Sequence, residues 1–140
     1  MAEQPFTVAH LSELPQFTSP DGSELDYDFR MVRRPLGVRA FGVNAMRALS
    51  AGGIVVPEHS EAEEGGAHEE LYYVARGSAR FTVDGESVDA PEGTFVFVPD
   101  PASTRSAVAE QDGTVVLGMG GEPGAVFTPS AWEAEWSGGS

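Results

Sequence analysis

The sequence predicts an all-β protein, an antiparallel sandwich or barrel built from about eight to ten short strands. Glycine and proline punctuate the whole chain, with 17 and 10 residues respectively, which is typical of short strands joined by turns. Short runs rich in β-branched and aromatic residues lie between them, and Leu71-Tyr72-Tyr73-Val74 is the clearest. Two such runs flank Asp84-Gly85, the dipeptide type that most strongly indicates a hairpin. Periodicity alone does not separate a sandwich from a barrel.

The first half of the chain combines a short helical segment with extended structure. Residues 8–14 favour one or two helical turns, with Thr7 as the N-cap. Residues 30–48 are expected to be extended, with an interruption near 35–37, and a further strand begins at 54–56.

The second half is expected to consist of paired strands and a short tail. These strands are predicted over 71–74, 79–83, 86–88, 94–98, 105–109 and 114–119. Residues 129–136 favour a short C-terminal helix that begins at Ser130, with Trp132 and Trp136 docking it. The last residues, 137–140, are expected to be disordered.

Composition and charge exclude several classes of partner. The 140 residues suit one domain, and the net charge of −14 disfavours nucleic acid and anionic membranes. Because the chain has no cysteine, disulfides, thiolate catalysis and cysteine-ligated zinc are excluded. The first residues lack the pattern of a secretory signal, and no apolar run is long enough for a spanning helix. We therefore expect a cytoplasmic protein.

Three spaced pairs of residues carry a family resemblance. Gly53 precedes His59 by five intervening residues, Glu70 precedes Gly77 by six, and Gly93 precedes Pro99 by five. Fifteen residues, including the Asp84-Gly85 pair, separate Gly77 from Gly93. This ordered pattern resembles the two motifs of the cupin superfamily, in the short spacing of small single-domain bacterial cupins.

The resemblance implies a single antiparallel cupin barrel, also called a double-stranded β-helix or jelly roll, with short N- and C-terminal helical turns. The barrel is expected over 39–120. Residues 1–38 would form an N-terminal extension packed on the barrel, and 121–140 a C-terminal tail with a short helix. A homodimer is also expected, because small cupins often pair and the N-terminal extension needs a surface to pack on.

In metal-binding cupins, three histidines and one glutamate hold a divalent metal inside the barrel, and such ligands suit Fe, Mn, Ni or Zn. His59 and Glu70 match two members of that set. The chain departs from it elsewhere, because Glu61 takes the place of the second histidine and Thr104 that of the third. Val108 also replaces the motif's asparagine, and Pro101 its glycine.

His68 is an additional candidate. It lies two residues before Glu70, so both side chains would face the same way on one strand. The resemblance, together with His68, thus predicts a metal set of His59, Glu61, His68 and Glu70. It also predicts a pocket lined by His59, Glu70, Tyr72 and Thr104.

Three functional hypotheses remain open on these residues. The leading one is a small-molecule-binding protein with a degenerate metal site, because a barrel of this size can enclose one ligand. The second is a metal-dependent oxygenase or isomerase that uses His59, His68 and Glu70. The third is metal-free acid–base catalysis, with Glu70 and His59 moving protons on a bound carbonyl compound.

Overall fold

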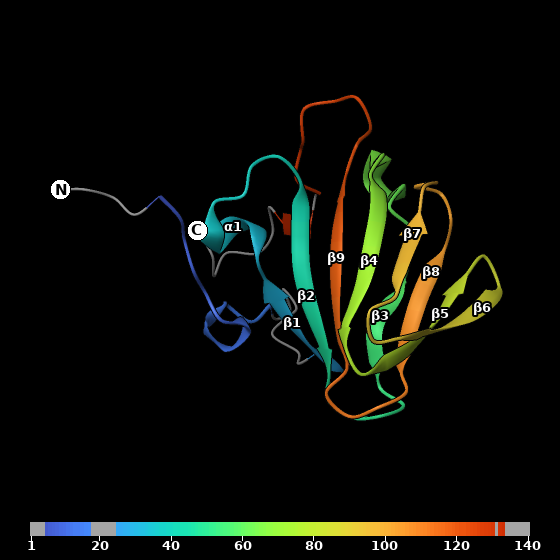
Figure 1. Cartoon of the computed structure of the whole chain (residues 1–140). Helices are drawn as coiled ribbons and strands as arrows, with labels where there is room; N and C mark the ends of the chain where they lie inside the picture. Colours follow the sequence, from blue (N-terminus) through green and yellow to red (C-terminus); the bar gives the residue numbers. More distant parts are fainter. Residues whose placement is uncertain (1–4, 18–24, 131, 134–140) are drawn as a thin grey trace.

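The computed structural model describes residues 5–17, 25–130 and 132–133, which form two antiparallel sheets facing each other (Figure 1). The first sheet has the strand order β1-β2-β9-β4-β7, and the second has the order β3-β8-β5-β6. The strands are β1 (Tyr27–Met31), β2 (Gly42–Ala48), β3 (Ile54–His59), β4 (Glu69–Arg76), β5 (Ser78–Val83), β6 (Glu86–Pro91), β7 (Phe95–Val98), β8 (Arg105–Ala109) and β9 (Val115–Gly121). The predicted all-β jelly-roll class is confirmed.

In the part of the chain that the structure describes, helical structure is limited to short segments. A 3-10 turn spans Leu11–Glu13, α1 spans Arg33–Leu36, and a second 3-10 turn spans Glu63–Gly65. The first turn begins later than the sequence predicts, because the His10 side chain, rather than Thr7, caps it by accepting from the backbone N–H of Ser12. Across the described residues, no helix combines the length and apolar character needed to cross a membrane.

The hairpin between β5 and β6 forms where the sequence predicts it. Asp84 and Gly85 both have positive φ, 49° and 84°, which is the backbone that a tight hairpin turn requires. The Asp84 side chain also accepts from the hydroxyl of Ser103 and the backbone N–H of Thr104, so the tip is tied to the segment before β8.

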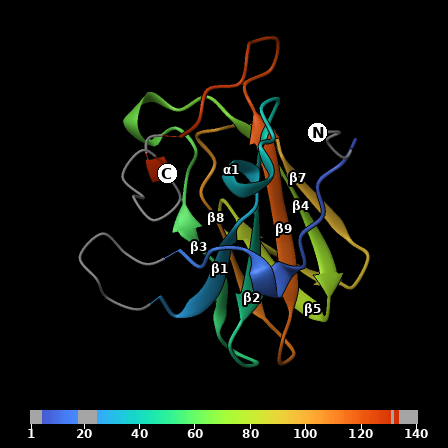
Figure 2. The same ribbon diagram turned by 90° about the vertical axis from the view of Figure 1, so that its left-hand side faces the viewer.

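The N-terminal and C-terminal segments both reach the sheet. β1 lies within residues 1–38 and pairs antiparallel with β2, at the edge of the five-stranded sheet (Figure 2). Trp132 and Glu133 are helical, and Trp132 packs edge-on against Phe17 and Phe29. Pro129 and Ser130, where the sequence predicts the helix to begin, are not helical. The remaining positions of the predicted helix, including Trp136, and the tail at 137–140 lie outside the described residues.

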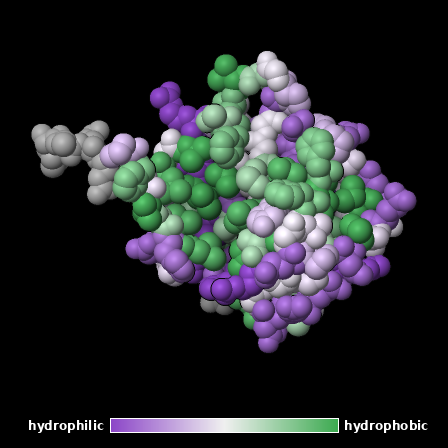
Figure 3. Space-filling view, in the orientation of Figure 1, coloured by the Kyte–Doolittle hydropathy of each residue, from purple (hydrophilic) through white to green (hydrophobic). Residues whose placement is uncertain are grey.

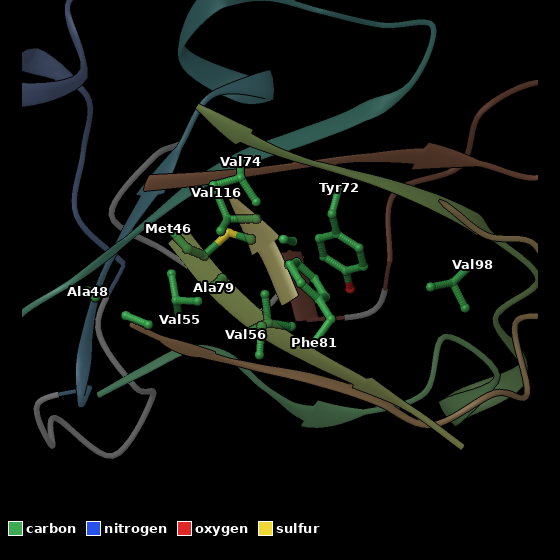
Figure 4. Close-up of a cluster of buried hydrophobic side chains, with 13 residues drawn as sticks. Met46, Ala48, Val55, Val56, Tyr72, Val74, Ala79, Phe81, Val98 and Val116 are labelled. Carbon is green, nitrogen blue, oxygen red and sulfur yellow. The ribbon is translucent and has the colours of Figure 1, made fainter. Parts of the chain in front are cut away.

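The apolar core fills the space between the sheets at one end (Figure 4). Val55, Phe81, Val74 and Val116, drawn from four strands of the two sheets, have no solvent exposure. Tyr72 is also buried in this cluster, with its ring 5.3 Å from that of Phe81. The core therefore ends at Tyr72, and the polar residues begin at its hydroxyl group.

Glycines on β9 allow the sheet to pack closely beside the site. A Cβ atom added at Gly120 would overlap the carbonyl oxygen of Glu69 on β4. At the neighbouring Gly121, the nearest atom to an added Cβ would be Phe127 Cδ1 at 3.6 Å, an ordinary contact.

We expect Gly120→Ala to destabilise the fold and Gly121→Ala to leave it nearly unchanged. The first substitution forces β4 and β9 apart, at a cost of about 2 kcal/mol or more, which lowers the melting temperature by roughly 5 °C. Thermal unfolding of the two variants checks this. Equal melting temperatures would show that β9 does not approach β4 as closely as described.

Candidate functional site

Three side chains meet at the polar end of the core. His59, Glu61 and Glu70 each offer one atom that could bind a metal ion, and these three atoms lie within 4.8 Å of one another. His59 ends β3, Glu61 follows in the next turn, and Glu70 lies on β4 of the opposite sheet. The site therefore joins the two sheets across the barrel.

The orientation of His59 is fixed from both sides of its ring. Its Nδ1 lies 2.7 Å from the carbonyl oxygen of Pro57, which only accepts, so Nδ1 carries a proton and donates it. Nε2 then faces the two carboxylates, at 2.8 Å from Glu61 Oε2 and 3.9 Å from Glu70 Oε1. This is the arrangement of a metal-binding histidine, whose second nitrogen is held by a backbone carbonyl.

Glu70 receives hydrogen bonds from two further side chains. The hydroxyl of Tyr72 and Nη1 of Arg105 both donate to Glu70 Oε1, the latter at 2.9 Å. Arg105 has no solvent exposure, and its remaining donors reach the carbonyl oxygens of Ser103 and Asp100. Thus a buried guanidinium and a phenol orient the carboxylate.

The pKa values reflect burial and these contacts. Burial raises the pKa of Glu70, as does the charge of Glu61, and the bond from Tyr72 only partly offsets them. Burial by itself would lower the pKa of His59, but the bonds to Glu61 and Pro57 outweigh it and raise the pKa. Burial by itself would raise the pKa of Glu61, but the bond to His59 outweighs burial and lowers the pKa overall. His59 and Glu61 therefore favour an imidazolium–carboxylate pair.

A cavity of about 760 Å³ opens beside this cluster. His59, Glu61, Glu70 and Tyr72 line it. Its volume lies within the range of about 300–1,000 Å³ that is typical of small-molecule sites.

Thr104 does not occupy the position that the sequence predicts. It is exposed, and its backbone exchanges two hydrogen bonds with Asp84 at the hairpin tip. Arg105, one residue later, begins β8, pairs with His59 across the sheet and points inward. The motif spacing points to Thr104, but the inward position belongs to Arg105. The difference of one residue matters because it reverses the face of a strand.

His68 also departs from the prediction. It precedes the first residue of β4, so the two-residue periodicity of a strand does not apply to it. Its ring stacks against Phe127, with centroids 5.3 Å apart, and it is absent from the cluster of His59, Glu61 and Glu70. It still lines the cavity.

Arg105 is the site residue that sequence reasoning missed. In the sequence, Arg105 stands out only as a single basic residue at the start of a predicted strand, and its neighbours do not indicate that it is buried.

Comparisons with known proteins identify the fold. No family model matches the chain, and the search of curated proteins finds no match. A cupin protein from Bacteroides fragilis is 18% identical, with a TM-score of 0.63, over 91% of this chain and 92% of that one. A predicted oxalate decarboxylase from Thermotoga maritima is 18% identical, with a TM-score of 0.59, over 81% and 97%. A Streptomyces PAC13 variant with uridine is 16% identical, with a TM-score of 0.55, over 85% and 82%.

These likenesses define the class of protein: the chain has the cupin fold. The resemblance inferred from its motifs is confirmed at that level. Because the identities are below 20%, the ligands of these structures are properties of those proteins.

We expect Arg105→Met to destabilise the protein far more than Arg80→Met. The first substitution leaves Glu70 without its buried partner, at a cost of about 3 kcal/mol. The second removes an exposed pair with Asp89, whose side chains are 53% and 62% exposed, and costs less than about 1 kcal/mol. Urea unfolding measures both. Similar small losses in the two variants would contradict a buried Arg105–Glu70 pair.

Proposed function

We propose that the chain binds a small molecule in the cavity, beside a divalent metal held by His59, Glu61 and Glu70. The observation that carries the proposal is the orientation of His59, whose Nδ1 donates to Pro57 while Nε2 faces two carboxylates. One imidazole and two carboxylates suit Fe, Mn, Ni or Zn. The residues therefore fit a metal, and His68 is not part of the proposed set.

The chain's own groups have defined tasks in this proposal. Arg105 and Tyr72 orient Glu70 by donating to one of its oxygens. The core behind Tyr72 excludes water from that side. When bound, the metal would act as a Lewis acid toward an oxygen of the ligand.

Metal-free acid–base catalysis is the second candidate, and Arg105 is the observation that favours it. A buried guanidinium at Glu70 already supplies a positive charge next to the carboxylate. The raised pKa of Glu70 favours a carboxyl group that exchanges a proton, with His59 3.9 Å away.

We expect Fe(II), Mn(II), Ni(II) or Zn(II), added singly, to raise the melting temperature. A metal at one hundred times its dissociation constant stabilises the native state by about 2.7 kcal/mol, or roughly 5 °C or more. His59→Ala should abolish the shift, and His68→Ala, a histidine in the same cavity, should preserve it. The absence of a shift with every metal would favour the metal-free candidate.

The same titration should depend on pH. The bond to Glu61 helps to raise the pKa of His59, and the Nε2 proton must leave before a metal binds. Affinity should therefore fall as pH decreases through that raised pKa, at a higher pH than for an ordinary histidine.

We also propose a homodimer that pairs through the outer face of the five-stranded sheet. Phe95 and Phe97 on β7 are 62% and 52% exposed, and their cross-strand partners Tyr73 and Leu71 share that face. Figure 3 shows apolar residues gathered over this side of the molecule. An uncharged, aromatic patch suits the centre of an interface, and two copies that each carry −14 approach best through it.

We expect light scattering to give the mass of a dimer, and Phe97→Glu to give that of a monomer. The charge would be buried without a partner at the interface. Val88→Glu, at a 52% exposed position on β6, is the matched control and should leave the dimer intact. A monomeric wild-type protein at high concentration would refute the proposal.

A further inference from the structure

One side of the cavity is an aromatic wall, formed by Phe17, Tyr27, Phe29 and Trp132. Phe17, Phe29 and Trp132 contact one another, with ring centroids 5.4 to 5.7 Å apart, and all three line the cavity. Tyr27 packs beside Phe29 and also lines it. Burial, with the charge of Asp26, raises the pKa of Tyr27 to about 12, so its phenol is neutral at pH 7.

The wall is anchored by an ion pair. Glu133, which follows Trp132, is buried and accepts from Arg33 Nε at 3.0 Å and Nη2 at 2.7 Å. The wall is therefore preorganised to receive a ligand, since the chain beside Trp132 is held in place.

Apart from the histidines, the ionisable side chains that line the cavity and carry a full charge at pH 7 are carboxylates. Among the described residues that form its surface there is no arginine, and the chain has no lysine. Five of the glutamates that line it are Glu61, Glu63, Glu70, Glu122 and Glu133. Glu69 also contributes to the surface, but it lies next to Glu70 on β4 and shares the outer face of Leu71 and Tyr73. Three of the five have cationic partners, namely His59, Arg105 and Arg33. The cavity surface therefore carries an excess of negative charge.

Glu63 and Glu122 supply that excess, because they make no ion pair with any described residue. A divalent metal held by Glu61 and Glu70 would leave these two glutamates unchanged. The cavity thus stays electronegative whether or not the metal binds. Acidic walls raise the local concentration of cations and repel anions.

We infer that the ligand of this cavity is an organic cation, with an ammonium group near the unpaired glutamates and an apolar body against the aromatic wall. This rests on the proposed small-molecule function and names its ligand class. Carboxylates attract the charge, and aromatic faces attract both alkyl groups and cations. Ligands that carry phosphate or carboxylate are disfavoured, because Glu63 and Glu122 repel them and no arginine or lysine among the described residues lines the cavity to offset that repulsion.

The test compares three probes of similar size and different charge: 2-phenylethylamine, 2-phenylethanol and 3-phenylpropionate. Calorimetry at pH 7 is run on protein treated with a chelator and on protein saturated with Zn(II). We expect the amine to bind at least about tenfold more tightly than the alcohol in both samples. The carboxylate should be the weakest binder of the chelator-treated protein.

Variants separate the charge from the wall. Glu63→Gln and Glu122→Gln should each reduce the preference for amine over alcohol several-fold, whereas Glu86→Gln, an exposed residue of β6, should not. Trp132→Ala should weaken the amine and the alcohol alike. Because Glu122 and Glu86 are both exposed, neither substitution threatens folding.

The outcomes distinguish this inference from the proposed function. Tighter binding of 3-phenylpropionate than of the amine to chelator-treated protein would overturn the inference, as would the binding of none of the three probes. A thermal shift with metal in that same protein would leave the proposed metal site standing. Tighter binding of the amine, with no shift of melting temperature by any metal, would support the inference and contradict the proposed metal site.

Discussion

The ion pair between Arg105 and Glu70 connects the two sheets where the apolar core ends. Arg105 belongs to β8 of the four-stranded sheet, and Glu70 to β4 of the five-stranded sheet. Arg105 is fully buried, and an unpaired charge there would cost several kcal/mol. The pair therefore constrains both strands, and with them the positions of His59 beside Arg105 and Tyr72 beside Glu70.

The same pair determines what chemistry the site can perform. Burial raises the pKa of Glu70, and its contacts with Tyr72 and Arg105 lower it only in part, so the pKa stays above its usual value. His59 and Glu61 form the opposite side of the cluster, where the imidazole favours the charged form. A metal would replace the Nε2 proton of His59, so protons and metal compete for one atom. Beyond the cluster, we propose that the cavity glutamates Glu63 and Glu122 and the aromatic wall select the ligand.

The fold followed from local signals, whereas part of the site did not. The Asp84-Gly85 turn has positive φ at both positions, and Asp-Gly is a dipeptide that readily adopts this backbone. The hairpin can therefore be predicted from the sequence. The motif spacing that points to Thr104 runs through a loop, and an error of one residue reverses the face of a strand. Strand periodicity does not apply to His68, because β4 begins one residue later. The aromatic wall unites Phe17 with Trp132, a proximity that no sequence period encodes.

The most direct test of the central claim is anomalous diffraction from crystals grown with Zn(II). We predict one strong peak about 2.0–2.1 Å from His59 Nε2, with oxygens of Glu61 and Glu70 as further ligands. A well-ordered cluster without a peak, or a peak at His68 remote from Glu70, would contradict it.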